Sequence, residues 1–188
     1  MEEKQTINQQ RNRGNFAVKR IATAGMIAAI YTVLGIVLAP FNFGIVQVRL
    51  GEALTLLPVF GGVSTIFGVT IGCLLTNAYG VITGASILGT LDIVVGTAAT
   101  LVAAILTYLL RNKRIKGIPF FSALPPVIVN ALVIGYSLTL VMSDGMNMAI
   151  FWVNFLSVFA GQFVSCVVVG LVLMNIIKKK NLSHYFEK

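Results

Sequence analysis

Long apolar runs separated by short polar linkers dominate the chain. A transmembrane helix needs about 20 apolar residues at a rise of about 1.5 Å per residue. Five runs reach or approach that length and a sixth, at 49–60, is shorter. The pattern predicts an all-α integral membrane protein with six transmembrane helices, at residues 21–39, 49–60, 63–79, 87–110, 124–142 and 148–177.

The basic residues predict the orientation of these helices. Of the 14 lysines and arginines, 5 lie in residues 1–20, 4 in residues 111–116 and 4 after residue 177, whereas the opposite side carries only Arg49. Short cytoplasmic segments are enriched in Lys and Arg. Six crossings place all three basic segments on one side, whereas five would separate them. We therefore expect a multi-pass protein of the cell membrane with cytoplasmic N- and C-termini.

Composition agrees with this organisation, because 57% of the 188 residues are hydrophobic and 11% are charged, against about 25% charged residues in a typical soluble domain. We expect three parts: a polar cytoplasmic segment at 1–20, a transmembrane substrate-binding domain at 21–177 and a basic cytoplasmic tail at 178–188. The net charge of +8 comes from clusters that flank apolar runs. It therefore indicates membrane topology rather than binding to nucleic acid.

Motifs for catalysis are missing from the sequence. There is no GxxxxGK[ST] motif for a nucleotide-binding P-loop. The single histidine, His184, lies in the tail, and Cys73 and Cys166 have no metal-ligand spacing. We therefore expect no enzyme activity, no metal and no cofactor bound by this chain. Binding or transport remains.

Three ionisable residues lie within or beside the apolar runs: Arg49, Glu52 and Asp92. Charged groups at membrane depth are costly, so they usually face a protein interior or a cavity. Arg49 and Glu52 are three residues apart, so on a helix they share a face and can pair. They could form a structural ion pair, or Arg49 could orient Glu52 toward a ligand. Asp92 could complement a helix dipole or line the same cavity.

Uncharged polar residues at similar depth are further candidates for binding a substrate. Such side chains bond either to neighbouring helices or to a ligand. The candidates are Gln47, Asn77, Asn130, Asn154 and Gln162.

The first apolar run also contains small residues four apart, Ala24 with Ala28 and Gly25 with Ala29. Small residues at this spacing let another helix approach closely. The partner helix could belong to this chain or to an external protein.

One stretch has a more specific meaning, FGIVQVRLGEALTLLP at residues 43–58. It resembles the QueT family, substrate-binding S components of energy-coupling factor (ECF) type ABC transporters. Further similar stretches are GCLLTN at 72–77, LDIVVGT at 91–97, and LPPV at 124–127 followed by Asn130 and Ala131. The resemblance extends over residues 19–177.

The resemblance implies an S-component-like bundle that captures a micronutrient from outside. It implies docking on a transmembrane scaffold subunit through Ala24 and Ala28, with ATP used by two separate ATPase subunits. The expected ligand is a queuosine precursor of the 7-deazaguanine class, or otherwise another vitamin such as cobalamin or a pyridoxine or pyrimidine compound. Gln162 stands where the family carries a glutamate, which argues against a cationic aminomethyl ligand.

Two other hypotheses fit the same residues. A stand-alone proton-coupled carrier would use Glu52 and Asp92 and would transport without ATP. A structural membrane subunit would bind no small molecule.

Overall fold

The computed structural model describes residues 2–44, 46–115, 118–143 and 145–186. These residues form helices and no strand, apart from one isolated bridge between Ile115 and Ile118. The predicted all-helical fold is therefore confirmed for the described residues. Five segments are long and apolar. The first is Phe16–Val37, within α1 (Glu2–Val37); the second is α4 (Val63–Ile82); the third is Asp92–Leu109, formed by η2 (Asp92–Gly96) and α5 (Thr97–Leu109). The fourth is α6 (Phe120–Met142), and the fifth is Met148–Lys179, in which α7 (Met148–Gln162), η3 (Phe163–Gly170) and α8 (Leu171–Lys179) follow one another without a break.

Five of the six predicted spans thus correspond to helices long enough to cross a membrane. The remaining one, predicted at 49–60, is built differently. Residues 46–49 are not helical, a 3₁₀ helix η1 follows at Leu50–Leu56, and the short helix α3 covers Pro58–Gly61. The helix ends at Gly61, one residue after the predicted end, and Gly62 has a positive φ of 56°, a conformation that glycine adopts without steric cost.

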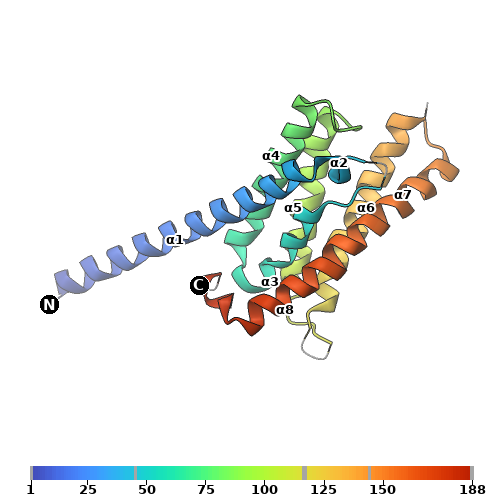
Figure 1. Cartoon of the computed structure of the whole chain (residues 1–188). Helices are drawn as coiled ribbons and strands as arrows, with labels where there is room; N and C mark the ends of the chain where they lie inside the picture. The colour runs from blue at the N-terminus through green and yellow to red at the C-terminus, as the bar shows by residue number, and fades with distance from the viewer. Residues whose placement is uncertain (1, 45, 116–117, 144, 187–188) are drawn as a thin grey trace.

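The segment of η1 and α3 runs through the middle of the bundle, from the end near α2 (Ala39–Asn42) to the opposite end (Figure 1). Every residue from Gly51 to Val59 is buried. Irregular backbone at membrane depth is tolerated only where protein or a water-filled cavity surrounds it, because lipid offers no hydrogen-bond partners. The surrounding helices shield this short segment from lipid, and Glu52 lies within it.

Close packing of α1 on α4 depends on two glycines of α4. A Cβ atom on Gly68 would lie 2.9 Å from Ile27, and one on Gly72 would lie 2.6 Å from Tyr31. Ile27 and Tyr31 belong to the buried core that α1 and α4 share. Two small residues four apart let the helix backbones approach, and this approach places the Tyr31 ring next to η1.

The paired prolines of α6 lie inside the helix, one turn after its start at Phe120 rather than at its beginning as predicted. Pro126 has no N–H to donate to the carbonyl oxygen of Ser122, four residues earlier. The hydroxyl of Thr107, on α5, donates to that oxygen instead, at 2.9 Å. A neighbouring side chain thus restores the missing bond, as membrane helices require.

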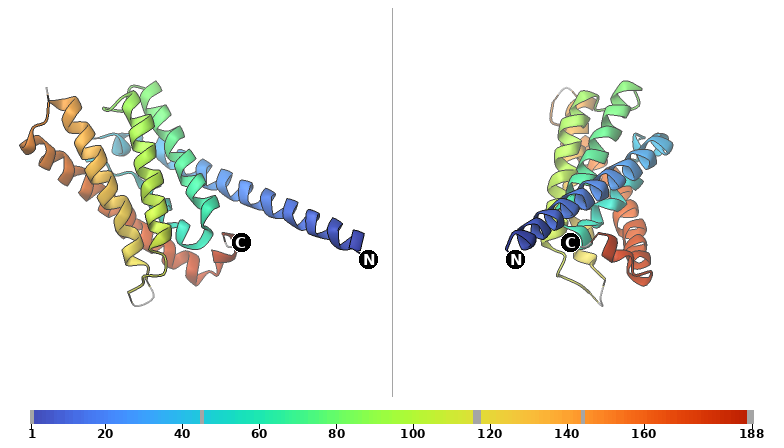
Figure 2. Two further views of the ribbon diagram at one scale, coloured as in Figure 1. Left: turned by 180° about the vertical axis from the view of Figure 1, so that it is seen from behind. Right: turned by 90° about the vertical axis from the view of Figure 1, so that its left-hand side faces the viewer.

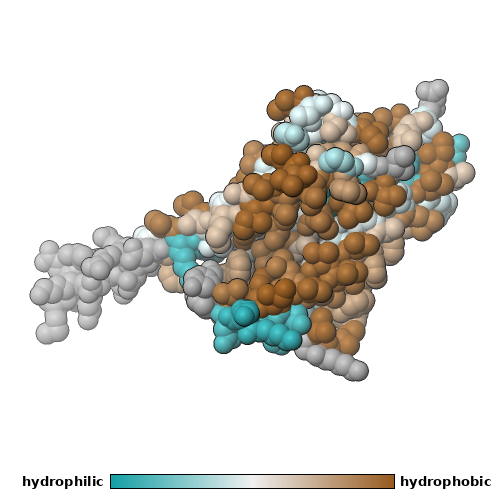
Figure 3. All heavy atoms as spheres, in the orientation of Figure 1, coloured by the Kyte–Doolittle hydropathy of each residue, from teal (hydrophilic) through white to brown (hydrophobic). Residues whose placement is uncertain are grey.

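Both described ends of the chain and the loop between α5 and α6 lie at the same end of the bundle (Figure 2). This agrees with the predicted topology, since the three basic segments belong to these parts. Hydrophobic surface covers much of the bundle, and a hydrophilic patch lies beside the end of α8 (Figure 3). Helix α1 continues unbroken across the expected boundary at residue 20.

Candidate functional site

The eight polar residues predicted at membrane depth are all buried in the structure, but Asn154, on α7, donates to Thr139 and to none of the other seven. The exposed fractions of these seven lie between 0 and 4%; the residues are Gln47, Arg49, Glu52, Asn77, Asp92, Asn130 and Gln162. Together with the groups that bond to them, they are called the polar core below. It has two parts, one around Asp92 and one around Glu52.

The Asp92 part is an ion pair with additional hydrogen bonds. Nη2 of Arg49 donates to both carboxylate oxygens of Asp92, at 2.9 and 3.1 Å. Ser86 donates its hydroxyl to the same carboxylate at 2.9 Å. A buried ion pair is stable only when geometry and further hydrogen bonds compensate for lost hydration, and this pair meets that condition.

Asn77 joins the two charged residues to α4. Its amide oxygen accepts from Arg49 at 3.3 Å, and its amide nitrogen donates to the backbone oxygen of Asp92 at 2.8 Å. That oxygen lies in η2, a π-helical stretch, and such stretches leave backbone groups free for other bonds. Gly96 is required beside them, because a Cβ there would lie 2.6 Å from the Asp92 carboxylate. Through Arg49, the Asp92 part therefore holds the non-helical residues 46–49 against α4 and η2.

The Glu52 part brings together three other elements. Oε1 of Glu52 accepts a hydrogen bond from the Tyr31 hydroxyl of α1 and another from the Thr100 hydroxyl of α5, both at 2.8 Å. The backbone oxygen of Glu52 accepts from Thr55 at 2.6 Å and from the Cys166 thiol at 3.5 Å. Glu52 thus lies where α1, α5 and η3 meet η1.

The predicted pairing of Arg49 with Glu52 is wrong. That prediction assumed a common helix, but the helical turn begins at Leu50 and Arg49 has the non-helical angles φ −87° and ψ 85°. The side chain of Arg49 consequently bonds to Asp92, 43 residues away. Asp92 is correspondingly the partner of Arg49 rather than only a helix-terminal charge.

Several buried polar atoms have no hydrogen-bond partner within the described part of the chain. They include Oε2 of Glu52, Oε1 of Gln47, Oδ1 of Asn130 and Nε of Arg49. Asn130, on α6, lies close enough to Glu52 for their side chains to interact. Most buried polar atoms in proteins are bonded. Unpaired acceptors of this kind are therefore the part of the polar core that a ligand could satisfy.

Gln47 lies next to the end of α7, where Gln162 is located. Gly161 packs directly on the backbone of Gln47, where any Cβ would overlap it. Gln162 lies one residue further, at the start of the π-helical η3, and its Oε1 is 3.6 Å from the Cys166 thiol. Gln162 is thus linked through the Cys166 thiol to the backbone oxygen of Glu52, and Gln47 lies against the residue before Gln162.

Sequence reasoning missed Tyr31, Thr100 and Ser86, which all donate to the two carboxylates. A signal existed for Tyr31, because a tyrosine in mid-membrane needs a partner for its hydroxyl. Thr100 and Ser86 gave none, since hydroxyls of membrane helices usually bond to their own backbone.

The predicted docking residues differ in accessibility. Ala28 is buried at the contact between α1 and α4, whereas Ala24 is half-buried. Gly25 and Ala29, the alternative pair with the same spacing, are both exposed. Ala24 and Gly25 line a surface groove of about 500 Å³ together with residues of α4, among them Ser64 and Phe67.

Comparison with known families gives a match over most of the chain. The family model of the QueT transporter matches residues 21–179. No characterised protein and no solved structure matches the chain. The matched region includes every residue of the polar core, four of the five long apolar segments in full and residues 21–37 of the first. The chain therefore belongs to the QueT transporter family, a family of membrane transporters and not of enzymes.

Proposed function

We propose that this chain is the substrate-binding subunit of an ECF-type importer and captures a queuosine precursor of the 7-deazaguanine class. The second crossing of the membrane is then made by η1 and α3, so that the chain crosses six times. Family membership supports transport, and the lack of a P-loop motif in the sequence fits an importer whose ATPases are separate chains.

The observation that carries the choice of ligand is the bonding of Glu52. One carboxylate oxygen accepts two hydrogen bonds, whereas the other, equally buried, has no partner among the described residues. A carboxylate accepts hydrogen bonds and attracts N–H donors strongly. The guanine edge of a 7-deazaguanine presents two adjacent N–H groups. These groups suit Glu52 and, beside it, the unpaired oxygen of Asn130.

Two side-chain amides whose oxygens have no partner within the described chain, those of Gln47 and Asn130, add to the groups that could bind such a base. A side-chain amide presents an acceptor on one side and two donors on the other, and it can rotate to offer either. Gln47 and Asn130 can therefore serve the ring carbonyl of such a base as well as its N–H groups. Since the polar core is buried, a ligand can enter only if the surrounding chain opens, and we expect the non-helical residues 46–49 to open and then to close again with Gln47 on the ligand. The ion pair of Arg49 with Asp92 then sets the position to which this segment returns.

The direct test exchanges Glu52 for glutamine. In Glu52→Gln the remaining oxygen can still accept from Tyr31 and Thr100, but Oε2 becomes an amide that donates. A ligand N–H then meets another donor instead of an acceptor. A hydrogen bond to a charged group is worth about 1.5–3 kcal/mol, so we expect affinity for a 7-deazaguanine base to fall roughly 10- to 150-fold. The measurement is isothermal titration of the purified chain.

The matched control is Asn154→Leu. Asn154 bonds to Thr139, away from the polar core, and lies eight residues before Gln162, about 12 Å along the helix. We expect this variant to bind the base normally. Unchanged binding by Glu52→Gln, in a protein with normal melting, would remove Glu52 from the site.

Docking on a scaffold subunit is proposed for the groove that Ala24 lines on α1 and α4. A tryptophan there fills the groove without touching the polar core. We expect Ala24→Trp to bind ligand normally but to stop uptake by cells that contain the complete importer. The control is Ala98→Trp, at an exposed position of α5. Normal uptake by Ala24→Trp would contradict docking at this groove.

A proton-coupled carrier is the second candidate, because Glu52 receives its hydrogen bonds from hydroxyls while Arg49 is engaged by Asp92. Such a carboxylate could take up a proton during transport. Uptake by the purified chain in liposomes under a pH gradient, without ATP, distinguishes the two. The importer subunit shows none under these conditions.

A further inference from the structure

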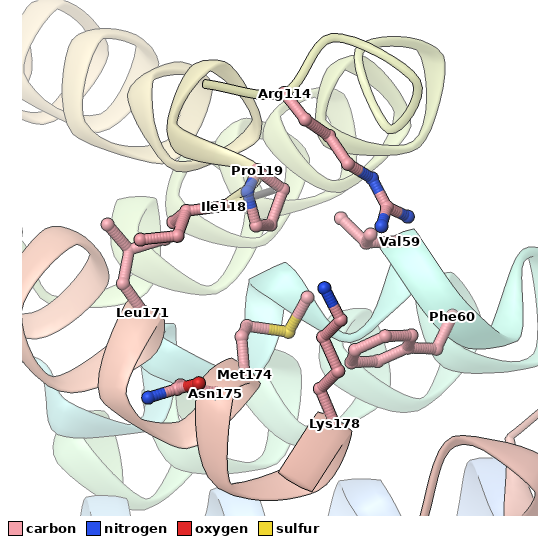
Figure 4. Close-up of a pocket in the computed structure, with 9 residues that line it drawn as sticks. All are labelled: Val59, Phe60, Arg114, Ile118, Pro119, Leu171, Met174, Asn175 and Lys178. Atoms are coloured by element: carbon pink, nitrogen blue, oxygen red, sulfur yellow. The ribbon is translucent and has the colours of Figure 1, made fainter. Parts of the chain in front are cut away.

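A second polar site lies at the opposite end of the bundle from α2. There a cavity of about 260 Å³ opens between α3, the end of the α5–α6 loop and α8, as Figure 4 shows. It lies on the side that the basic segments mark as cytoplasmic. Its lining residues are Val59, Phe60, Arg114, Ile118, Pro119, Leu171, Met174, Asn175 and Lys178.

The cavity has an apolar floor and a cationic rim. Val59, Pro119 and Met174 are buried, and the first and last of these belong to a hydrophobic cluster with Phe60 and Leu171 at its edge. Arg114 and Lys178 are exposed. In Figure 4 their charged groups point toward one another across the cavity from the loop and from α8.

Nothing in the described part of the chain neutralises these two charges. The ion pair found there joins Arg49 to Asp92, far from the rim. The Nε of Arg114 donates to the backbone oxygen of Arg111 at 3.4 Å, which leaves the other guanidinium N–H groups available. Two cations that converge on one cavity repel each other unless an anion lies between them.

We propose that this cavity binds an anionic phospholipid of the cytoplasmic leaflet. The phosphate lies between Arg114 and Lys178, the exposed Asn175 contacts the headgroup, and the start of an acyl chain lies on Met174 and Leu171. Basic pockets between helices on the cytoplasmic side suit anionic headgroups, and neighbouring basic residues add attraction at the membrane surface. Here those residues are Arg111, Lys113, Lys179 and Lys180.

The size and lining of the cavity favour a lipid over other anions. At about 260 Å³ it is smaller than the roughly 300–1,000 Å³ of a site that encloses a whole small molecule. It therefore suits one part of a larger amphiphile. A free phosphate would use the rim but leave the apolar floor without a partner, whereas the glycerol and first methylenes of a lipid contact it.

The test measures lipid binding to the purified full-length chain by native mass spectrometry. The probes are phosphatidylglycerol, phosphatidylcholine and soluble glycerol phosphate. The double variant Arg114→Gln/Lys178→Gln is compared with Lys113→Gln/Lys179→Gln, which removes the same charge from exposed residues outside the cavity. Each cation near an anionic surface contributes about a fivefold effect. We expect the first variant to weaken phosphatidylglycerol binding roughly 25-fold and the second, which removes only attraction from residues around the cavity, to weaken it clearly less.

Three results would overturn the proposal. Equal weakening in both double variants would indicate diffuse attraction to the surface. Displacement of the lipid by glycerol phosphate at similar concentration would indicate a site for free anions. Unchanged lipid binding in Arg114→Gln/Lys178→Gln, accompanied by loss of assembly with a partner subunit, would indicate a contact with protein.

Discussion

Asp92 and Glu52 are two buried carboxylates of one polar core, and their bonding differs. Asp92 accepts from Arg49 with both oxygens and from Ser86. Glu52 accepts two hydroxyls on one oxygen and nothing from the described chain on the other. A carboxylate with a complete set of partners stabilises the fold, whereas one that keeps an unpaired oxygen retains capacity to bind a ligand. The comparison separates a structural part of the core from a binding part.

The largest expected effect is the loss of the Asp92 carboxylate. Asp92→Ala leaves the guanidinium of Arg49 buried without its counter-charge, which costs about 3–5 kcal/mol. We expect strongly reduced thermal stability in detergent, measured by the unfolding of the purified protein. The double variant Arg49→Met/Asp92→Leu removes both charges and should regain most of the loss. A single variant with wild-type stability would contradict the structural role of Asp92.

A smaller effect is expected on the Glu52 side. Tyr31→Phe removes one hydroxyl from Oε1 of Glu52 and leaves that of Thr100. The loss of one hydrogen bond costs about 0.5–1.5 kcal/mol. We expect slightly lower stability together with several-fold weaker binding of a 7-deazaguanine base, because the carboxylate loses part of its orientation. Both quantities come from thermal melts with and without ligand. Lower stability with unchanged affinity would assign Tyr31 to folding alone.

The smallest effect is expected for Ser86→Ala, the matched change on the Asp92 side. It also removes one hydroxyl that donates a hydrogen bond to a carboxylate, but Arg49 keeps both of its bonds to Asp92. Ser86 is also only partly buried, so water can replace the lost donor. We expect a change of stability below about 0.5 kcal/mol and no change in ligand affinity. A loss of affinity larger than that of Tyr31→Phe would reverse the assignment of the two parts.

The polar residues of the core could be predicted from the sequence because each is isolated in an apolar run. A charge or amide at membrane depth is unfavourable unless protein surrounds it, and all eight such residues, Asn154 included, are indeed buried. Their partners could not be predicted in the same way. The helical spacing of three between Arg49 and Glu52 suggested a pair, but the chain is not helical at Arg49. Residues three apart lie on one face only where the chain between them is helical, and here it is not.

The predicted docking residues show the same limit. Small residues four apart indicate a close helix contact, but the sequence does not say which helix provides it. In the fold, Gly68 of α4 packs on the backbone of Ala24 and Gly72 on that of Ala28; Ala28 is buried, whereas Ala24 still lines an open groove. Residues four apart share one face of a helix, so the two differ in their position along α1 and not in their direction around it.

The sequence by itself determined the membrane class, the long apolar helices, the common side of the basic segments and the family. These properties depend on the hydrophobicity of consecutive residues and on the charges near the ends of each span, and both can be read directly along the chain. Tertiary structure alone decided that Arg49 bonds to Asp92, that Tyr31 and Thr100 bond to Glu52, and that Arg114 and Lys178 converge on one cavity. Each of these contacts joins residues from different elements, and only the packing of helices brings them within hydrogen-bond or charge range.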